Sequence, residues 1–519
     1  MNLNPLKYSM LLCLASSAWI ACSDDSSSSS SGNGDGNSPS DSKPLTQMAC
    51  SEIMYHHPDS LVEWVEIYIE SGEDLENMAL SELRLDGAVE YNFPEEPMKK
   101  GERLVVTGDL DAFKKAYPDF NGRLFGPWNN DNKGEVEKLS NGGDVISVKL
   151  RGAGDIDCSF DNSPPWPSLA DGAGSSLVFL GGNASMPNNW AASKKNGGNP
   201  GSSEDEVYAP LTVRINEVAP TDGSEDWIEF YNSGKTDVDI SGWLLIASRR
   251  GDTLSIPEGS IVPAESYFVL KQEQFEDDLL LLKRGENLYL REYVNGTWTL
   301  SETGLEYPAT PSGTAVILEL SDGSLMQGSL KKATPEKKNV SELLSGPLYV
   351  NEIFYNPPEG QLEFIEIINT ADSAVTLSLP IRSKTGVWEI SGLGDSDLET
   401  LSIPAGGLLL MLPDTNILDL EAYAATLSKD VVLQKYSGKI SNRGEQILVK
   451  EPYDFVEDLT KPNAIDWCYR WSDVVLYSDD GLWSEEADGM GMSLHRADYS
   501  MPGSDPGAWT ANLPTPGEK

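Results

Sequence analysis

Apolar and polar residues alternate in short runs along most of the chain after residue 47. In one such run, Val65 and Ile67 would point to one side of an extended strand, while Trp64, Glu66 and Tyr68 would point to the other. The runs are rich in β-branched and aromatic residues, and Gly, Pro, Asn or Asp interrupts them about every 8–12 residues. Because this pattern is typical of packed antiparallel sheets, it predicts an all-β protein.

One strand–turn–strand signature occurs three times. Each copy joins an apolar strand that contains a glutamate to a second strand that begins with an acidic residue, through a turn rich in Pro, Gly and Asp. The copies begin roughly 135–165 residues apart, which is the spacing of whole domains and not of short solenoid repeats. They occupy residues 51–58 with 63–69, 215–220 with 226–233, and 350–358 with 363–369.

The length of the chain agrees with several domains, since a single core stops growing near about 250–300 residues and the chain has 519. We predict a signal peptide over residues 1–21 and a flexible linker over residues 22–46. Three sandwich domains are predicted over residues 47–205, 210–342 and 347–519, and they are called the first, second and third modules below.

Four stretches of the second module carry a family resemblance. Residues 216–218 read Asn-Glu-Val, residues 226–232 read Asp-Trp-Ile-Glu-Phe-Tyr-Asn, and residues 238–243 and 263–270 continue the pattern. These stretches resemble the lamin-tail domain family, whose fold is immunoglobulin-like and whose members serve mainly as attachment modules. The resemblance implies three tandem immunoglobulin-like antiparallel β-sandwiches, and from its composition we expect the Ser-rich tether before them to be disordered.

The first and third modules share a further ending of this kind. Both contain a Ser-Asn-x-Gly motif, after Leu139 and after Ile440, and both contain Gly-x-Gly-x-Ser-Leu, ending at Leu177 and at Leu494. The second module lacks the Gly-x-Gly-x-Ser-Leu motif and has other sequences at residues 285–290 and 313–318.

The N-terminus reads as an export signal. The apolar run over residues 8–20 is shorter than the roughly 20 residues that span a bilayer, but it fits a signal peptide. Residues 19–22, Trp-Ile-Ala-Cys, resemble a lipobox, which predicts lipidation at Cys22 and an outer-membrane or cell-surface lipoprotein. The alternative is an ordinary secretory signal that is cut elsewhere. The Ser-, Gly- and Asp-rich segment over residues 23–43 is predicted to be a flexible tether.

Charge and cysteine content limit which partners and which cysteine-based sites are expected. Acidic residues outnumber basic ones by 82 to 38, for a net charge of −44, and so negative a surface argues against nucleic acid as a partner. Cys50 and Cys158 lie in strands of the first module, so an oxidising compartment would allow a disulfide, although the reduced pair is an equal alternative. Cys468 is expected to be a buried thiol. The sequence contains no Cys-x-x-Cys pair, so a cysteine-based metal site is not expected.

The three histidines form no convincing catalytic or metal-binding set. His56 and His57 are adjacent, so on an extended strand they point to opposite faces and do not share one ion. The third module has Asn356 and Pro357 at these positions, and His495 lies near the end of the chain. A surface turn is therefore expected at His56 and His57.

A set of acidic residues recurs in all three copies of the signature. Glu63 and Glu66 would project from opposite faces of a strand, which argues against a glycosidase-like pair. A cross-strand pair such as Glu52 with Glu66 leaves two readings open: a hard cation site with a turn carbonyl, or hydrogen bonds to strand-edge amides and basic neighbours, which we favour. The set comprises Glu52, Glu63, Glu66, Glu217, Asp226, Glu229, Glu352, Glu363 and Glu366.

Two further features of the sequence are weaker candidates for a binding site. Residues 129–135 faintly resemble a calcium loop, but Lys133 stands where an oxygen ligand is needed. An exposed strip of aromatic residues would stack on sugar rings, although buried sandwich tryptophans are the commoner case. The tryptophans concerned are Trp64, Trp190, Trp227, Trp243 and Trp509.

These observations predict a non-catalytic, lipid-anchored envelope protein that acts by binding or adhesion, with no catalytic residue, metal or cofactor. Its expected partners are the membrane, through the N-terminal lipid, and a polysaccharide or protein ligand at the cell surface. One alternative is a surface carbohydrate-binding protein, and the other is an exported hydrolase or a hydrolase accessory subunit. The sequence makes no prediction of oligomeric state.

Overall fold

The structure is a computed structural model, and it describes most of residues 47–518. The predicted signal peptide, Cys22 and the linker lie outside the described residues, as does the calcium-like stretch over residues 129–135. Gaps in the description occur at residues 60–61, 72–78, 129–137, 151–155, 203–205, 209–210, 221–224, 276–277, 295–296, 341, 359, 394–395, 415–422, 426, 458–464 and 480.

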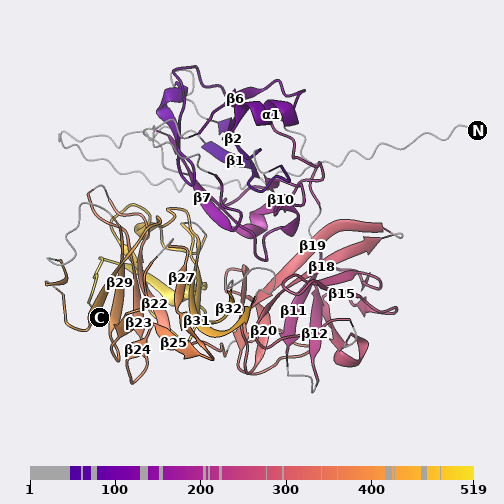
Figure 1. Ribbon diagram of the computed structural model, residues 1–519, viewed down its shortest axis with the longest axis vertical. Coiled ribbons are helices and arrows are strands. Elements are labelled where there is room, and N and C mark those ends of the chain that lie inside the picture. The colour runs from indigo at the N-terminus through magenta and orange to yellow at the C-terminus, as the bar shows by residue number, and fades with distance from the viewer. Residues whose placement is uncertain are drawn as a thin grey trace, which may run out of the picture. The chain divides into compact units, whose positions relative to one another are not determined.

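The first module consists of two sheets whose apolar faces share one core (Figure 1). The sheet that contains both strands of the repeated signature is called the signature sheet, and the other is called the opposite sheet. The signature sheet has the order β10 (Trp190–Ala192), β9 (Leu177–Phe179), β1 (Gln47–Met54), β2 (Trp64–Ser71), β5 (Arg103–Thr107) and β6 (Arg123–Phe125). The opposite sheet has the order β4 (Tyr91–Asn92), β3 (Leu83–Gly87), β7 (Gly143–Leu150) and β8 (Ile156–Asp161).

The second module repeats this plan with one strand fewer in its signature sheet. That sheet has the order β21 (Leu325–Leu330), β20 (Thr314–Glu319), β11 (Val213–Ala219), β12 (Trp227–Asn232) and β17 (Ser266–Lys271). The opposite sheet has the order β15 (Asp252–Ser255), β14 (Leu244–Ala247), β18 (Glu286–Val294) and β19 (Thr297–Tyr307).

The third module returns to six strands. Its signature sheet has the order β34 (Trp509–Asn512), β33 (Ser493–Arg496), β22 (Leu348–Phe354), β23 (Phe364–Asn369), β29 (Leu408–Pro413) and β30 (Val431–Tyr436). The opposite sheet contains β27 (Glu389–Ser391), β31 (Gln446–Glu457) and β32 (Ile465–Leu476).

Short elements complete the modules. Two-residue to four-residue strands pair as β13 (Val238–Asp239) with β16 (Ile261–Val262), β24 (Val375–Thr376) with β28 (Ser402–Ile403), and β25 (Ser378–Ile381) with β26 (Lys384–Val387). The α-helix α1 (Leu110–Ala116) begins after Asp109, whose carboxylate accepts the N–H groups of Asp111 and Ala112, both at 2.9 Å. Single 3₁₀ turns are η2 (Leu80–Glu82), η3 (Ser168–Ala170), η4 (Pro187–Asn189), η5 (Gln272–Gln274), η6 (Glu485–Ala487) and η7 (Pro506–Ala508).

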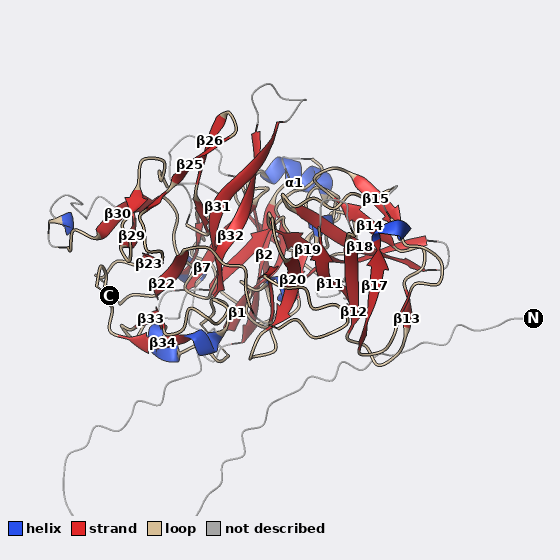
Figure 2. Cartoon of the chain, turned by 90° about the horizontal axis from the view of Figure 1, so that it is seen from below, coloured by secondary structure: helices blue, strands red, loops and turns tan. Residues whose placement is uncertain are grey.

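The prediction of an all-β sandwich architecture is confirmed, and Figure 2 shows how strands dominate the described chain. The predicted alternation is also observed, because Val65 and Ile67 enter the core between the sheets while Trp64 packs on the outer face. All named strand pairs are antiparallel except β5 with β6 and β29 with β30. Among the described residues, no helix is long and apolar enough to span a bilayer.

The first module carries one covalent crosslink. Cys50 of β1 and Cys158 of β8 form a disulfide, with their Cα atoms 6.3 Å apart, so the crosslink joins the signature sheet to the opposite sheet. The equivalent strand position is Ile215 in the second module and Val350 in the third, where each pairs with the strand that follows. Cys468 is a buried free thiol.

Candidate functional site

The repeated acids meet at a β-bulge in the first strand of every signature hairpin. The register shifts just before Glu52, Glu217 and Glu352, and each of these then pairs directly with the second glutamate across the strands. A bulge adds one residue, so its side chain can share a face with its neighbour's. The three buried cross-strand pairs are Glu52 with Glu66, Glu217 with Glu229, and Glu352 with Glu366.

The added bulge residue donates a hydrogen bond to the second glutamate in each module. Ser51 Oγ lies 2.6 Å from Glu66 Oε1, Asn216 Nδ2 lies 2.8 Å from Glu229 Oε1, and Asn351 Nδ2 lies 2.5 Å from Glu366 Oε1. The bulge is therefore a device that supplies a local donor to an otherwise buried carboxylate.

In the first module the other donors come from a turn far along the chain. The N–H of Asn199 lies 2.9 Å from Glu52 Oε1, and the N–H of Gly201 lies 2.5 Å from Glu66 Oε2. Ser176 Oγ also donates to Glu52, and the guanidinium of Arg103 forms an ion pair with Glu66. The two carboxylates thus hold an Asn-Pro-Gly turn at the end of the module.

The second and third modules hold a matching turn. The N–H of Thr334 donates to Glu217 at 3.1 Å and that of Glu336 donates to Glu229, while the N–H of Thr515 lies 3.0 Å from Glu352 Oε1. The N–H of Gly517 lies 2.7 Å from Glu366 Oε2. We call each set of bulge residue, two glutamates and x-Pro-x turn a clamp; the turns occupy residues 199–201, 334–336 and 515–517.

Electrostatics distinguish the clamps. Glu229 and Glu366 have amide donors but no ion-paired cation among the described residues, and burial raises the pKa of each to about 7 against the opposing effect of their hydrogen bonds. Burial likewise raises the pKa of Glu217, although hydrogen bonds from Thr314 and Thr334 oppose it. In the first module, by contrast, the guanidinium of Arg103 forms an ion pair with Glu66.

The hydrogen bonds of the clamp agree with the structural reading of the acids. Their oxygens accept hydrogen bonds from the module's own backbone, as the structural reading requires, and within the described residues no group of three His, Cys, Asp or Glu side chains is placed to hold a metal ion. The acid directly before the second strand of the hairpin behaves similarly in the first and third modules. Glu63 accepts the N–H of Leu139 at 2.9 Å, and Glu363 accepts that of Ile440 at 3.1 Å.

The histidines occupy separate places. His56 Nδ1 lies 2.5 Å from Asp171 Oδ1, whereas His57 Nδ1 bonds the backbone of Asp59, so the two rings do not converge. The corresponding contact in the third module is made by Asn356 Nδ2 and Asp488 Oδ1 at 2.6 Å. This repeated bridge ties the hairpin turn to a late loop of its module.

A Ser–His–Glu cluster in the third module superficially resembles a hydrolase triad, and sequence reasoning missed it. Ser493 Oγ lies 2.5 Å from Glu352 Oε1 and 2.9 Å from His495 Nε2, and the same imidazole nitrogen lies 3.3 Å from Glu352. In a triad the acid orients one ring nitrogen and the serine contacts the other. Here Ser493 is fully buried and takes the place that Ser176 and Thr314 hold in the other clamps, so the geometry is that of a clamp.

Most of the tryptophans singled out from the sequence are buried. Trp64, Trp190, Trp243 and Trp509 belong to the cores or to their covers, and the indole N–H groups of Trp190 and Trp509 bond carbonyl oxygens six residues earlier, at 2.8 and 2.7 Å. Trp227 differs, because it is half-buried on the outer face of β12.

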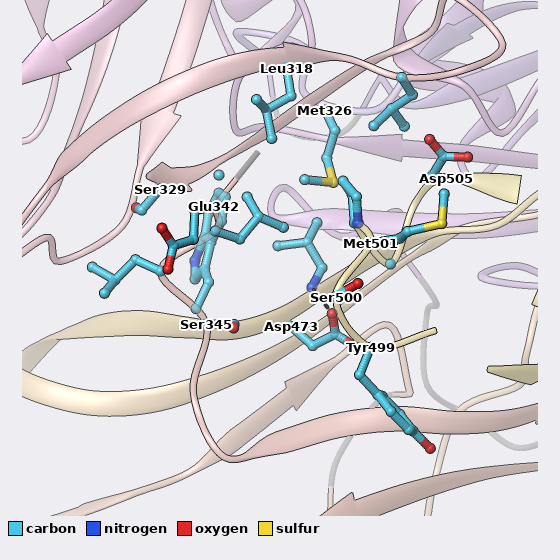
Figure 3. A pocket seen from close by; sticks show the side chains of 18 of the residues that line it. Leu318, Met326, Ser329, Glu342, Ser345, Asp473, Tyr499, Ser500, Met501 and Asp505 are labelled. Carbon is cyan, nitrogen blue, oxygen red and sulfur yellow. Dashed lines mark hydrogen bonds between the residues drawn. The ribbon is translucent and has the colours of Figure 1, made fainter. Parts of the chain in front are cut away.

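A cavity of about 730 Å³ lies between β20 and β21 on one side and β32 on the other (Figure 3). Leu318 and Met326 lie across it from Asp473 and Tyr499. Its polar groups bond the protein itself: Asp473 accepts the N–H of Val350 at 3.0 Å, and Asp505 accepts the hydroxyl of Ser321 at 2.7 Å. The second of these contacts links the turn after β20 to the N-cap residue of η7.

Two sheets packed face to face, with this strand order and the signature hairpin at the centre of one of them, define a β-sandwich module protein of immunoglobulin-like type. Residues 206–331, which make up most of the second module, match the Lamin Tail Domain family. A crystal structure of a DUF4876 family protein from Bacteroides thetaiotaomicron is similar at 12% identity and a TM-score of 0.17, over 54% of this chain and 89% of that chain. No curated protein matches the chain.

Proposed function

We propose that the chain is a non-catalytic, lipid-anchored protein of the bacterial cell envelope, which presents three lamin-tail-like modules for binding or adhesion. The observation that carries this proposal is the clamp. The six buried glutamates that recur in the signature hold the chain ends of their own modules by hydrogen bonds, which supports a structural role for them.

The clamp also supports counting three copies of one domain. The family match covers the second module, and the first and third modules share its strand order, its bulge, its glutamate pair and its x-Pro-x turn. Two unrelated sandwiches would not be expected to share all four of these features at equivalent positions.

Export and anchoring rest on the N-terminal sequence. The lipobox-like residues end at Cys22, and the Ser-rich segment after it would keep the modules away from the membrane. The disulfide between Cys50 and Cys158 agrees with an oxidising compartment outside the cytoplasm.

The anchor is tested by expressing the chain in a Gram-negative host and following its detergent-phase partitioning and incorporation of labelled fatty acid. The native protein should enter the detergent phase and take up label, and Cys22→Ala should do neither. A native protein that stays in the aqueous phase would contradict the anchor.

The hydrolase alternative has its own test. The purified protein should not turn over a panel of esters, phosphoesters and glycosides above the blank rate. Turnover that Ser493→Ala or Glu352→Gln abolishes, in variants that keep the native circular dichroism spectrum, would replace the non-catalytic proposal with an enzyme.

A further inference from the structure

The outer face of the signature sheet is covered by the chain itself in the first module. Trp64 is fully buried there, because Phe113 and Tyr117 from α1 and its C-cap meet its ring edge-on at centroid distances of 6.4 and 6.0 Å. Its indole N–H donates to the Tyr117 hydroxyl at 2.9 Å. Met54 and Val105 complete this small second core.

The third module covers the same face in a similar way. Phe354, Phe364 and Leu410 hold the positions of Met54, Trp64 and Val105, and Tyr423 and Leu427 pack over them. In both modules the cover comes from the segment next to a parallel sixth strand, β6 or β30.

The second module lacks both features among its described residues. β17 is the edge of its signature sheet, and the chain turns directly into η5 after it. Ala219, Trp227 and Val269 hold the three outer positions by strand register, and Trp227 and Val269 are only half-buried. No described side chain makes a ring contact or a hydrogen bond with the indole of Trp227.

Two tyrosines extend this surface along the same strands. Tyr231 and Tyr267 are cross-strand partners, with ring centroids 4.9 Å apart, and both are half-buried. Their hydroxyls have no hydrogen-bond partner among the described residues. Together with two flanking cations the surface is called the open aromatic face, and it comprises Arg214, Trp227, Tyr231, Tyr267, Val269 and Lys271.

Unpaired cations border this face. The guanidinium carbon of Arg214 lies 4.5 Å from the centroid of Tyr231, and its buried Nε has no hydrogen-bond partner in the described chain. Lys271 is exposed beside Trp227 at its register position, and it too forms no ion pair with a described residue. Acidic residues outnumber basic ones by 82 to 38, so two cations without an ion pair to any described residue, one at each end of the face, are a specific feature.

The segment that crosses the face adds further positive charge. The clamp turn over residues 334–336 lies on Glu217 and Glu229, and the exposed Lys332 and Lys337 flank it without described ion pairs. The nearby carboxylate of Glu319 is engaged with Lys338 at 3.3 Å. Glu336 is the one exposed acid within the turn itself.

These features identify a chemical class of occupant. A covering helix like that of the first module packs mainly apolar and aromatic side chains such as Phe113 onto the sheet, and it would leave the tyrosine hydroxyls and Arg214 without partners, at a cost in free energy. A saccharide offers hydroxyls to the polar rims and flat C–H faces to the rings, and a carboxylate on the sugar neutralises the cations. We propose that the open aromatic face binds an acidic saccharide built of uronate units, which specifies the binding role proposed above and rests on it.

The test uses the full mature protein in detergent, with polygalacturonate as the probe and its methyl ester as a matched neutral polymer. Affinity electrophoresis should show retention by polygalacturonate that falls with added salt, and weaker retention by the ester. Trp227→Ala and Arg214→Gln should each weaken binding roughly tenfold, because each removes a half-buried side chain that contributes a ring or a charge to the face. Lys271→Gln, which alters an exposed residue, should weaken it by a smaller factor and reduce its salt dependence.

Tyr453→Ala and Arg250→Gln are the controls, because they remove an exposed ring and an exposed cation away from this face and should leave binding unchanged. Thermal melting checks that each variant folds, and Lys271→Gln carries the test if Trp227→Ala does not. The proposal is overturned by a native protein that polygalacturonate does not retain, or by equal, salt-insensitive retention on the ester. It is also overturned if the native protein is a dimer that Trp227→Ala dissociates, since a second copy then covers the face. None of these results affects the lipid-anchoring or turnover tests.

Discussion

The first and second modules begin with the same hairpin and differ in what surrounds it. In the first, Trp64 lies under α1, Glu66 is paired with Arg103, and Cys50 is crosslinked to Cys158. In the second, Trp227 is half-buried, Glu229 has only amide donors, and Ile215 replaces the crosslinked cysteine. The signature hairpin therefore builds the sandwich without these additions, and the additions decide how stable the module is and which face it leaves open.

Removing the crosslink should have the largest effect on the difference in stability between the two modules. The disulfide joins residues 108 positions apart, and opening a loop of that size costs roughly 4–5 kcal/mol when the entropy of the unfolded chain dominates. Cys50→Ser with Cys158→Ser should therefore speed amide hydrogen exchange in β1, β2 and β8 while exchange in β11 and β12 stays unchanged. Equal acceleration in both modules would mean that they unfold as one unit.

Truncating the equivalent tryptophans tests how differently the two outer faces are covered. Trp64→Ala removes a fully buried ring and a hydrogen bond to Tyr117, so the free energy of unfolding of the first module should fall by about 3–5 kcal/mol. Trp227→Ala removes a half-buried ring without such partners and should cost about 1 kcal/mol. Denaturant unfolding followed by hydrogen exchange would measure both, and similar losses would show that the second face is also covered in solution.

A pH series separates the clamps by their charge. The folded pKa values of Glu229 and Glu366 are raised from 4.5 to about 7, chiefly by burial, so the folded state binds their protons more tightly than the unfolded chain does. This contribution to stability is full below pH 4.5 and is lost as the pH rises through 7. We expect the melting temperature of the second module to fall by several degrees between pH 5 and pH 8 on this account.

The matching control for the pH series is Glu229→Gln, which cannot ionise and still accepts a hydrogen bond. Its second-module transition should depend less on pH than that of the native protein, while the transitions of the other modules should keep their profiles. An unchanged pH profile in Glu229→Gln would show that Glu229 keeps an ordinary pKa.

The strands and the glutamate pairs could be predicted from the sequence because both depend on local order. Alternation places Val65 inside and Trp64 outside, and the recurrence of Glu52 and Glu66 marks a special position. The clamp could not be predicted, because its donors lie elsewhere: a bulge that alternation does not reveal puts Ser51 beside Glu66, and the turn at Gly201 follows 135 residues after Glu66.

The contrast between Trp64 and Trp227 was likewise beyond local reasoning. Both residues follow an acid and precede an apolar residue and a glutamate, so the two hairpins look alike. What buries Trp64 is Phe113 and Tyr117, some fifty residues later, in a helix for which the second module has no described counterpart. The sequence signal for the difference is the length of one connection. The chain between β17 and β18 of the second module is shorter than the chain between β5 and β7 of the first, which contains α1 and β6.

The smallest expected effect concerns the clamp turns, where the second module is again the exception. The residue that donates to the second glutamate has a positive φ in all three modules: 82° at Gly201, 78° at Gly517 and 58° at Glu336. Glycine adopts this conformation freely, whereas a residue with a Cβ pays about 1 kcal/mol for it. Glu336 also places a second negative charge near Glu229. Glu336→Gly should therefore raise the stability of the second module by about 0.5–1 kcal/mol.

The variant Glu336→Ala separates the two causes, because it removes the charge and keeps the Cβ. If backbone strain dominates, differential scanning calorimetry should show a higher second-module transition for Glu336→Gly than for Glu336→Ala, and Gly517→Ala should lower the transition of the third module. A Cβ at Gly517 would also come within 2.9 Å of Leu427, so that substitution adds a steric cost to the same strain. Equal transitions for the two Glu336 variants would assign the effect to charge alone, and the three clamp turns would then differ in electrostatics but not in backbone strain.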